Sequence, residues 1–148
     1  MSDSQTKDTK SSISEKFKAR RSEVSKEIYE NIEHLSNLKT LKTAQVNMLS
    51  LRQRLLEDNH TLLEHITMLR KKLREEKAHV MEDISKNLQL RYQTNEKNLV
   101  IDGKTSATKE YLEIFENQVA FFNDSIKTID NIIFGIKTRL DIEKTLGL

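Results

Sequence analysis

The chain has 148 residues, of which 32% are charged and 36% apolar, and its formal net charge is +2. It contains no proline, three glycines and no cysteine, so helix breakers are scarce and disulfides and thiolate metal sites are excluded. Aromatic residues make up only 5% of the chain, too few for a bulky globular core. The composition predicts an all-α protein of long amphipathic helices that completes its core by oligomerising.

The sequence contains no apolar run of the roughly 18 residues that a membrane-spanning helix needs. Residues 1–14 are mostly Ser, Thr, Lys and Asp, and they lack the apolar segment of a secretory signal. We therefore expect a soluble, cytoplasmic protein with no membrane partner. Lys and Arg outnumber Asp and Glu in residues 1–80, so the basic excess lies in the N-terminal half.

Residues 1–12 are polar and poor in apolar side chains, which predicts a disordered tail. From Ile13 onward, apolar residues recur at helical spacings of three, four and seven. This pattern is carried by Phe17, Val24, Ile28, Ile32, Leu35 and Leu38.

A stricter seven-residue repeat follows, and it has the two apolar series of a coiled coil. The series are Met48, Leu55, Leu62, Leu69 and Ile66, Leu73, Val80, and the earlier positions of the second series are the polar Gln45, Arg52 and Asn59. Polar residues at such positions fix register and oligomer state, or leave the coiled coil weak and frayed. We expect one long coiled-coil-like region over residues 13–99, either a single helix or two helices with a break at Asn37 or Asn59.

Residues 100–106 contain Asp102-Gly103, which is a turn signal, followed by Thr105 and Ser106, which can cap a helix. This segment predicts a turn or linker, and a C-terminal helix is expected over residues 107–146. That helix has an aromatic-rich apolar stripe, which we expect to carry oligomerisation. The stripe consists of Tyr111, Phe115, Phe122, Ile126, Ile129, Ile133, Ile136 and Leu140.

The sequence offers little catalytic chemistry. Gly103-Lys104-Thr105 lacks the upstream glycine and strand of a phosphate-binding loop. His60 and His65 are five residues apart, whereas a zinc-binding helix places its two histidines four apart. Paired carboxylates lie among lysines at helical spacing, as on a solvated helix face. We expect no enzymatic activity, no cofactor and no metal.

Basic side chains form two clusters that could contact nucleic-acid phosphates. The first consists of Lys16, Lys18, Arg20 and Arg21. The second consists of Arg70, Lys71, Lys72, Arg74 and Lys77, with Lys86 and Arg91 further along and Tyr92 available to stack on a base. The alternative interpretation is the ordinary charged exterior of a coiled coil.

The stretch from Phe115 through Phe121, Phe122 and Ile129 to Phe134-Gly-Ile136-Lys137 resembles the C-terminal helix of phage recombination mediators of the UvsY type. Order and register match without a gap. The resemblance covers roughly residues 70–147 and is most specific over 115–137. The family's Lys-x-Arg pair is represented by Lys86 alone, because Leu88 stands at the place of the arginine.

The resemblance implies a ring-like homo-oligomer that assembles through C-terminal helices and has no catalytic activity. It implies sequence-independent binding of single-stranded DNA, contact with a single-strand-binding protein, and help in loading the strand-exchange recombinase in DNA recombination and repair. A phage-encoded protein would act in the cytoplasm of the host cell. The alternative is a structural coiled-coil scaffold or tether, such as a virion component, without DNA affinity.

Overall fold

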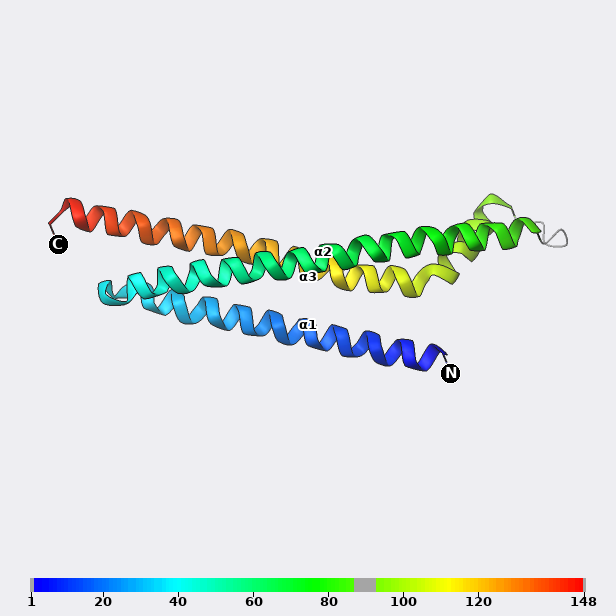
Figure 1. Cartoon of the computed structure of the whole chain (residues 1–148), viewed down its shortest axis with the longest axis horizontal. Coiled ribbons are helices and arrows are strands. Elements are labelled where there is room, and N and C mark those ends of the chain that lie inside the picture. The colour runs from blue at the N-terminus through cyan, green and yellow to red at the C-terminus, as the bar shows by residue number, and fades with distance from the viewer. Residues whose placement is uncertain (1, 87–92, 148) are drawn as a thin grey trace. The chain divides into compact units, whose positions relative to one another are not determined.

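The computed structural model describes the backbone of residues 2–86 and 93–147, and the side chains within these ranges from Thr9 onward (Figure 1). The described residues form three long α-helices and one short 3-10 helix, with no strand among them. These elements are α1 (Ser2–Glu33), η1 (His34–Ser36), α2 (Leu38–Lys86) and α3 (Thr94–Thr145). The predicted all-α fold is confirmed.

The predicted disordered tail at residues 1–12 is wrong where the structure describes it, because α1 begins at Ser2. The segment contains neither proline nor glycine, so no residue in it opposes helix formation. A helix that is anchored by packing further along can extend into such a polar segment, since propagation adds one hydrogen bond for each residue fixed.

The break in the first half of the chain lies at Asn37, one of the two predicted positions. Asn37 adopts an extended conformation, with φ −119° and ψ 125°, between η1 and α2. Its side-chain Oδ1 accepts a hydrogen bond of 3.0 Å from the backbone N–H of Lys39, as expected of an N-cap residue. Its carbonyl accepts from the N–H groups of Thr40 and Leu41, which starts α2. The chain therefore reverses direction here.

The other predicted position, Asn59, does not interrupt α2, and residues 100–106 lie inside α3 rather than in a linker. The C-terminal helix accordingly begins at Thr94 instead of at residue 107. Within it, the Thr105 hydroxyl donates to the carbonyl of Ile101 at 2.8 Å, and both residues are buried. Burial of this helix face outweighs the local turn preference of Asp102-Gly103, because glycine weakens a helix by only about 1 kcal/mol.

The described helices divide into two compact units, and α2 and α3 contribute to both. Unit 1 comprises Met1–Thr61 with Gln118–Leu148, and unit 2 comprises Leu62–Asn117. In unit 1, α1 runs antiparallel to α2 and parallel to α3, which gives a three-helix bundle (Figure 1). Its buried apolar residues are Val24, Ile28, Leu41, Ala44, Met48, Leu51, Leu55, Phe122, Ile126, Ile129 and Ile136.

Unit 2 is an antiparallel pair formed by the second part of α2 and the first part of α3. Arg70 in α2 pairs with Glu116 in α3 at 3.2 Å, and the Thr108 hydroxyl donates to the Glu76 carboxylate at 2.8 Å. The buried apolar residues of this unit are Leu62, Ile66, Val80, Ile101 and Phe115. A two-helix pair buries a narrow seam, so its outer faces remain exposed.

The predicted seven-residue repeat is confirmed by burial. Met48, Leu55 and Leu62 are buried, as are Ile66 and Val80, while Leu69 and Leu73 are half-buried. The polar positions of the repeat meet polar partners in α3 within unit 1. Arg52 pairs with Asp130 at 2.6 Å, and the Asn59 amide donates to Asn123 at 2.8 Å. These pairs favour one register of α2 against α3.

Candidate nucleic-acid interface

The predicted DNA-contacting residues that the structure describes lie on α2 and are mostly engaged by carboxylates. Arg70 pairs with Glu116, Lys71 lies 4.0 Å from Glu75, Lys72 lies 3.9 Å from Glu76, and Lys86 lies 2.8 Å from Glu82. All four cations are well exposed, so solvent screens these pairs and each contributes little to stability. The carboxylates nevertheless lower the positive potential that a phosphate would meet.

The remaining predicted DNA contacts differ from these four. Arg74 is exposed and Lys77 is half-buried, and no carboxylate of the described residues lies within 4.0 Å of either. Arg91 and Tyr92 lie outside the described residues. The structure therefore brings Arg70, Lys71, Lys72, Arg74, Lys77 and Lys86 onto one helix.

One carboxylate in unit 2 has a perturbed pKa. A hydrogen bond of 2.6 Å from the Lys109 ammonium, and the positive charge of that ammonium, lower the pKa of the Asp102 carboxyl below its ordinary value of 3.8. Slight desolvation opposes this effect, and the charge of Lys77 adds a smaller lowering. The sequence predicts a turn at Asp102, but this residue lies on the exposed face of α3.

The residues predicted to carry oligomerisation are largely buried against other residues of the same chain. Five of them are buried, namely Phe115, Phe122, Ile126, Ile129 and Ile136, and three are half-buried, namely Tyr111, Ile133 and Leu140. The rings of Phe115 and His65 lie 5.5 Å apart between the two helices of unit 2. Ile136 packs with Leu41 and Ala44 in unit 1. Large apolar residues that remain exposed are Leu99, Phe134 and Ile142 of α3 and Leu146, which directly follows this helix.

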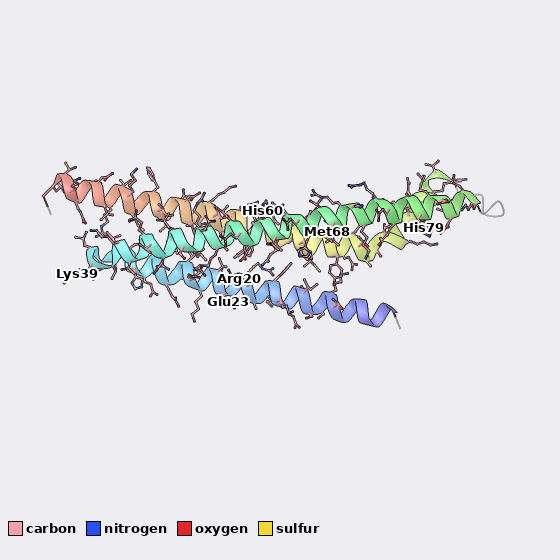
Figure 2. All side chains as sticks on the ribbon, viewed as in Figure 1. Arg20, Glu23, Lys39, His60, Met68 and His79 are labelled. Atoms are coloured by element: carbon pink, nitrogen blue, oxygen red, sulfur yellow. The ribbon has the colours of Figure 1, made fainter. Side chains whose placement is uncertain are left out.

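The first basic cluster, on α1, lies next to a hollow that the sequence does not reveal. Arg20 pairs with Glu23 of the same helix at 3.3 Å (Figure 2). It also pairs with Asp58 of α2 at 3.0 Å. Arg21 turns instead toward α3, where it donates to the Gln118 side chain at 2.7 Å. Beside it, an open hollow of about 770 Å³ lies along α1 and reaches α3 at Phe121. Its lining residues are Lys18, Arg21, Ser22, Ser25, Lys26, Tyr29, Glu30, Glu33 and Phe121.

This hollow combines cations and aromatic rings from residues that are almost a hundred positions apart in the sequence. The sequence signals it only in part, through the Lys16–Arg21 cluster and the exposed register of Tyr29. Phe121 could be placed beside Tyr29 only once α1 and α3 were known to run parallel. A second hollow of about 480 Å³ lies where the end of α1, η1 and the start of α2 face α3, and it is lined mainly by apolar residues, including Ile32, Leu41 and Ile132.

No helix in the described part of the chain combines the length and the apolar character needed to cross a bilayer. Within residues 2–86 and 93–147, no three metal-binding side chains come together as a candidate metal site. Comparisons of the chain with protein-family models, with curated proteins and with solved structures found no match.

Proposed function

We propose that this chain is a non-catalytic recombination mediator that binds single-stranded DNA and helps to load a strand-exchange recombinase. The observation that carries the proposal is the UvsY-type pattern of aromatic, Ile and Ile-Lys positions over residues 115–137, which matches in order and register. The partners are then single-stranded DNA, the recombinase and a single-strand-binding protein.

The exposed cations of α2 support DNA binding in this proposal. A strand of DNA carries a charge at every nucleotide, and cations that replace its counterions supply affinity without sequence preference. Arg74 is exposed and has no carboxylate within ion-pair distance among the described residues. The neighbouring pairs of Lys71 and Lys72 are long, at 4.0 and 3.9 Å, so a phosphate can displace their carboxylates.

Homo-oligomerisation, ring-like as in the resembling family, is the second part of the proposal. Most of the apolar stripe of α3 is buried within one chain, so the contacts between chains must use other apolar residues. Phe134 and Ile142 of α3, and Leu146 directly after it, are suited to this, because each exposes more than half of its surface. Burying such side chains against a second copy supplies apolar stabilisation.

Titration of a labelled oligothymidine with the protein, at about 50 mM and about 200 mM salt, tests DNA binding. We expect binding at the lower salt concentration and a marked decrease at the higher one. Absence of binding at the lower concentration would exclude the mediator function. The mass of the intact assembly tests the second part: a ring-sized oligomer is expected, and a monomer, dimer or trimer would contradict it.

A structural scaffold without DNA affinity is the second candidate function, and one observation favours it. Four cations on α2 have carboxylates at ion-pair distance, as on the outer face of an ordinary coiled coil. The same titration separates the two functions, because a scaffold does not bind the oligonucleotide at either salt concentration.

A further inference from the structure

The hollow between α1 and α3 in unit 1 has the chemistry of a site for a single-stranded nucleic acid. Lys18, Arg21 and Lys26 supply three positive charges, and Tyr29 and Phe121 supply two aromatic rings. Proteins that bind single strands without sequence preference combine these elements, because cations follow the phosphates while bases stack on aromatic faces. The volume of about 770 Å³ is enough to admit a nucleotide.

The three cations are not neutralised by the described part of the chain. No carboxylate of the described residues lies within 4.0 Å of Lys18, Arg21 or Lys26. The Glu23 and Glu27 carboxylates of the same helix are directed to Arg20 and Arg54. Arg21 is held by the neutral amide of Gln118, which fixes its guanidinium without cancelling its charge. This contrasts with α2, where four predicted DNA contacts are paired.

The two aromatic rings are placed differently within the hollow. Tyr29 is 69% exposed, so most of its side chain is open to solvent. Phe121 is half-buried, and the centroid of its ring lies 6.0 Å from that of Phe122, which is buried in the core. An exposed ring and a half-buried ring in the lining of one hollow offer aromatic faces on which bases can stack from solvent.

The acidic residues of the hollow make the charge uneven along α1, with the cations at one end of the hollow and the carboxylates at the other. Glu30 and Glu33 follow Tyr29 in α1, whereas the three cations precede it. Phosphates are repelled from the end with Glu30 and Glu33 and attracted to the end with Lys18 and Arg21. A strand can therefore enter with its backbone over the cations and its bases toward Tyr29 and Phe121.

We infer that this groove binds single-stranded DNA by stacking bases on Tyr29 and Phe121 and by pairing phosphates with Lys18, Arg21 and Lys26. The inference rests on the proposed DNA-binding function and assigns the base contacts to α1 and α3. The cations of α2 then supply phosphate contacts that do not involve the bases.

Substitution of Tyr29 tests the stacking contact, because an exposed side chain can be removed without disturbing the core. We expect Tyr29→Ala to weaken oligothymidine binding by roughly 5- to 150-fold, whereas Tyr29→Phe retains most of the affinity. Val46→Ala is the control, since Val46 is 65% exposed on α2, does not line the groove and has no role in the proposed assembly. Tyr29→Ala with unchanged affinity would overturn the inference, and a changed assembly mass with unchanged affinity would identify the groove as a contact between copies.

Charge reversal tests the phosphate contacts. We expect Lys18→Glu with Lys26→Glu to lower the slope of log affinity against log salt by about 0.7 for each phosphate that is no longer neutralised. Lys127→Glu, on α3 and outside the lining of the groove, should leave the slope nearly unchanged. Photocrosslinking of bromodeoxyuridine-substituted oligonucleotide, mapped by mass spectrometry, should label the tryptic peptides 27–39 and 110–127.

The outcomes separate this inference from the function on which it depends. If the wild-type protein does not bind DNA at low salt, the proposed function itself fails. If the wild type binds but crosslinks map only to residues 70–86 of α2, and the variants of Lys18, Lys26 and Tyr29 bind normally, the function stands and the groove inference fails.

Discussion

The guanidinium of Arg21 in α1 donates a hydrogen bond of 2.7 Å to the side-chain oxygen of Gln118 in α3. The same Gln118 side chain donates through Nε2 to the carbonyl of Phe17 at 3.3 Å. Gln118 is only 1% exposed, so one buried amide joins two helices that are far apart in the sequence. Buried polar groups are costly unless paired, which gives this amide a large influence on the position of α1 against α3.

Replacement of Gln118 by Ala should therefore destabilise unit 1. The variant lacks both hydrogen bonds and leaves a small cavity, and we expect the free energy of unfolding to fall by about 2 kcal/mol. Urea denaturation followed by circular dichroism measures the change. The control Lys127→Ala, at an exposed position of the same helix, should stay within about 0.5 kcal/mol of wild type. Equal stabilities for the two variants would contradict the role assigned to Gln118.

Ile129 tests whether the apolar stripe of α3 serves the chain's own core. This side chain is fully buried in unit 1, so Ile129→Ala should lower the unfolding free energy by about 2–5 kcal/mol. Leu49→Ala, at a residue of α2 that is 50% exposed, should have a much smaller effect. The decrease for Ile129→Ala should be the same at two protein concentrations tenfold apart. A decrease that grows on dilution would place Ile129 between chains instead.

Gly103 tests the correction of the predicted turn. In α3 a Cβ atom at this position would have no neighbour within 4 Å, and glycine is a poor helix former. We expect Gly103→Ala to raise the unfolding free energy by about 0.5–1 kcal/mol, measured by thermal denaturation. If Gly103 lay in a turn that needed a left-handed glycine, the substitution would lower the free energy of unfolding instead. A lower melting temperature would therefore support the predicted linker at residues 100–106.

Charge reversal on α2 tests the phosphate contacts that the sequence predicts. We expect Lys71→Glu with Lys72→Glu to weaken DNA binding at low salt, while the assembly mass stays unchanged. The salt slope should fall by about 0.7 for each lysine that neutralises a phosphate in the wild type. Titrations of the labelled oligonucleotide at several salt concentrations measure this. A scaffold protein would show no functional change. If the variant and the wild type have the same slope of log affinity against log salt, these lysines do not contact DNA phosphates.

Asp102 gives a prediction for pH. The Lys109 ammonium lowers the pKa of Asp102 in the folded chain, so the stabilisation of this pair is present above the ordinary value of 3.8. It disappears as pH falls through the lowered pKa of the folded state. Lys109→Met should raise the pKa of Asp102 toward 3.8, as followed by carboxyl-carbon NMR. Lys104→Met should leave it lowered, and an equal rise in both variants would contradict the specific pair.

The sequence predicts the helices and their buried faces well, because helical periodicity records which side of a helix is apolar. It places Met48, Leu55 and Leu62 in one buried series, and it identifies Asn37 as a possible break. It fails at Asp102-Gly103, where burial of Ile101 and Thr105 overrides a local turn signal. The prediction of disorder at residues 2–12 is wrong for a related reason. Polar residues do not stop a helix that is anchored by packing further along the chain.

The candidate site is predictable only in its separate parts. The sequence identifies the basic cluster that includes Lys18 and Arg21, but the partners of a charge are set by packing. Arg20 and Arg21 are adjacent, and one pairs with Asp58 of α2 while the other reaches Gln118 of α3. Tyr29 and Phe121 line the same hollow only because α1 and α3 run parallel, and no local sequence pattern encodes that arrangement.

The reversal at Asn37 has a consequence for the order in which the chain folds. Contacts between α1 and α2, such as Asn31 with Asn47, close loops of modest length, so this hairpin can form early and during synthesis. Contacts between α1 and α3, such as Arg21 with Gln118, join residues that are much further apart in the sequence, so we expect them to form last. The groove beside Tyr29 therefore comes into existence only when the final third of the polypeptide docks, and a nascent or truncated chain would carry the cations without the site.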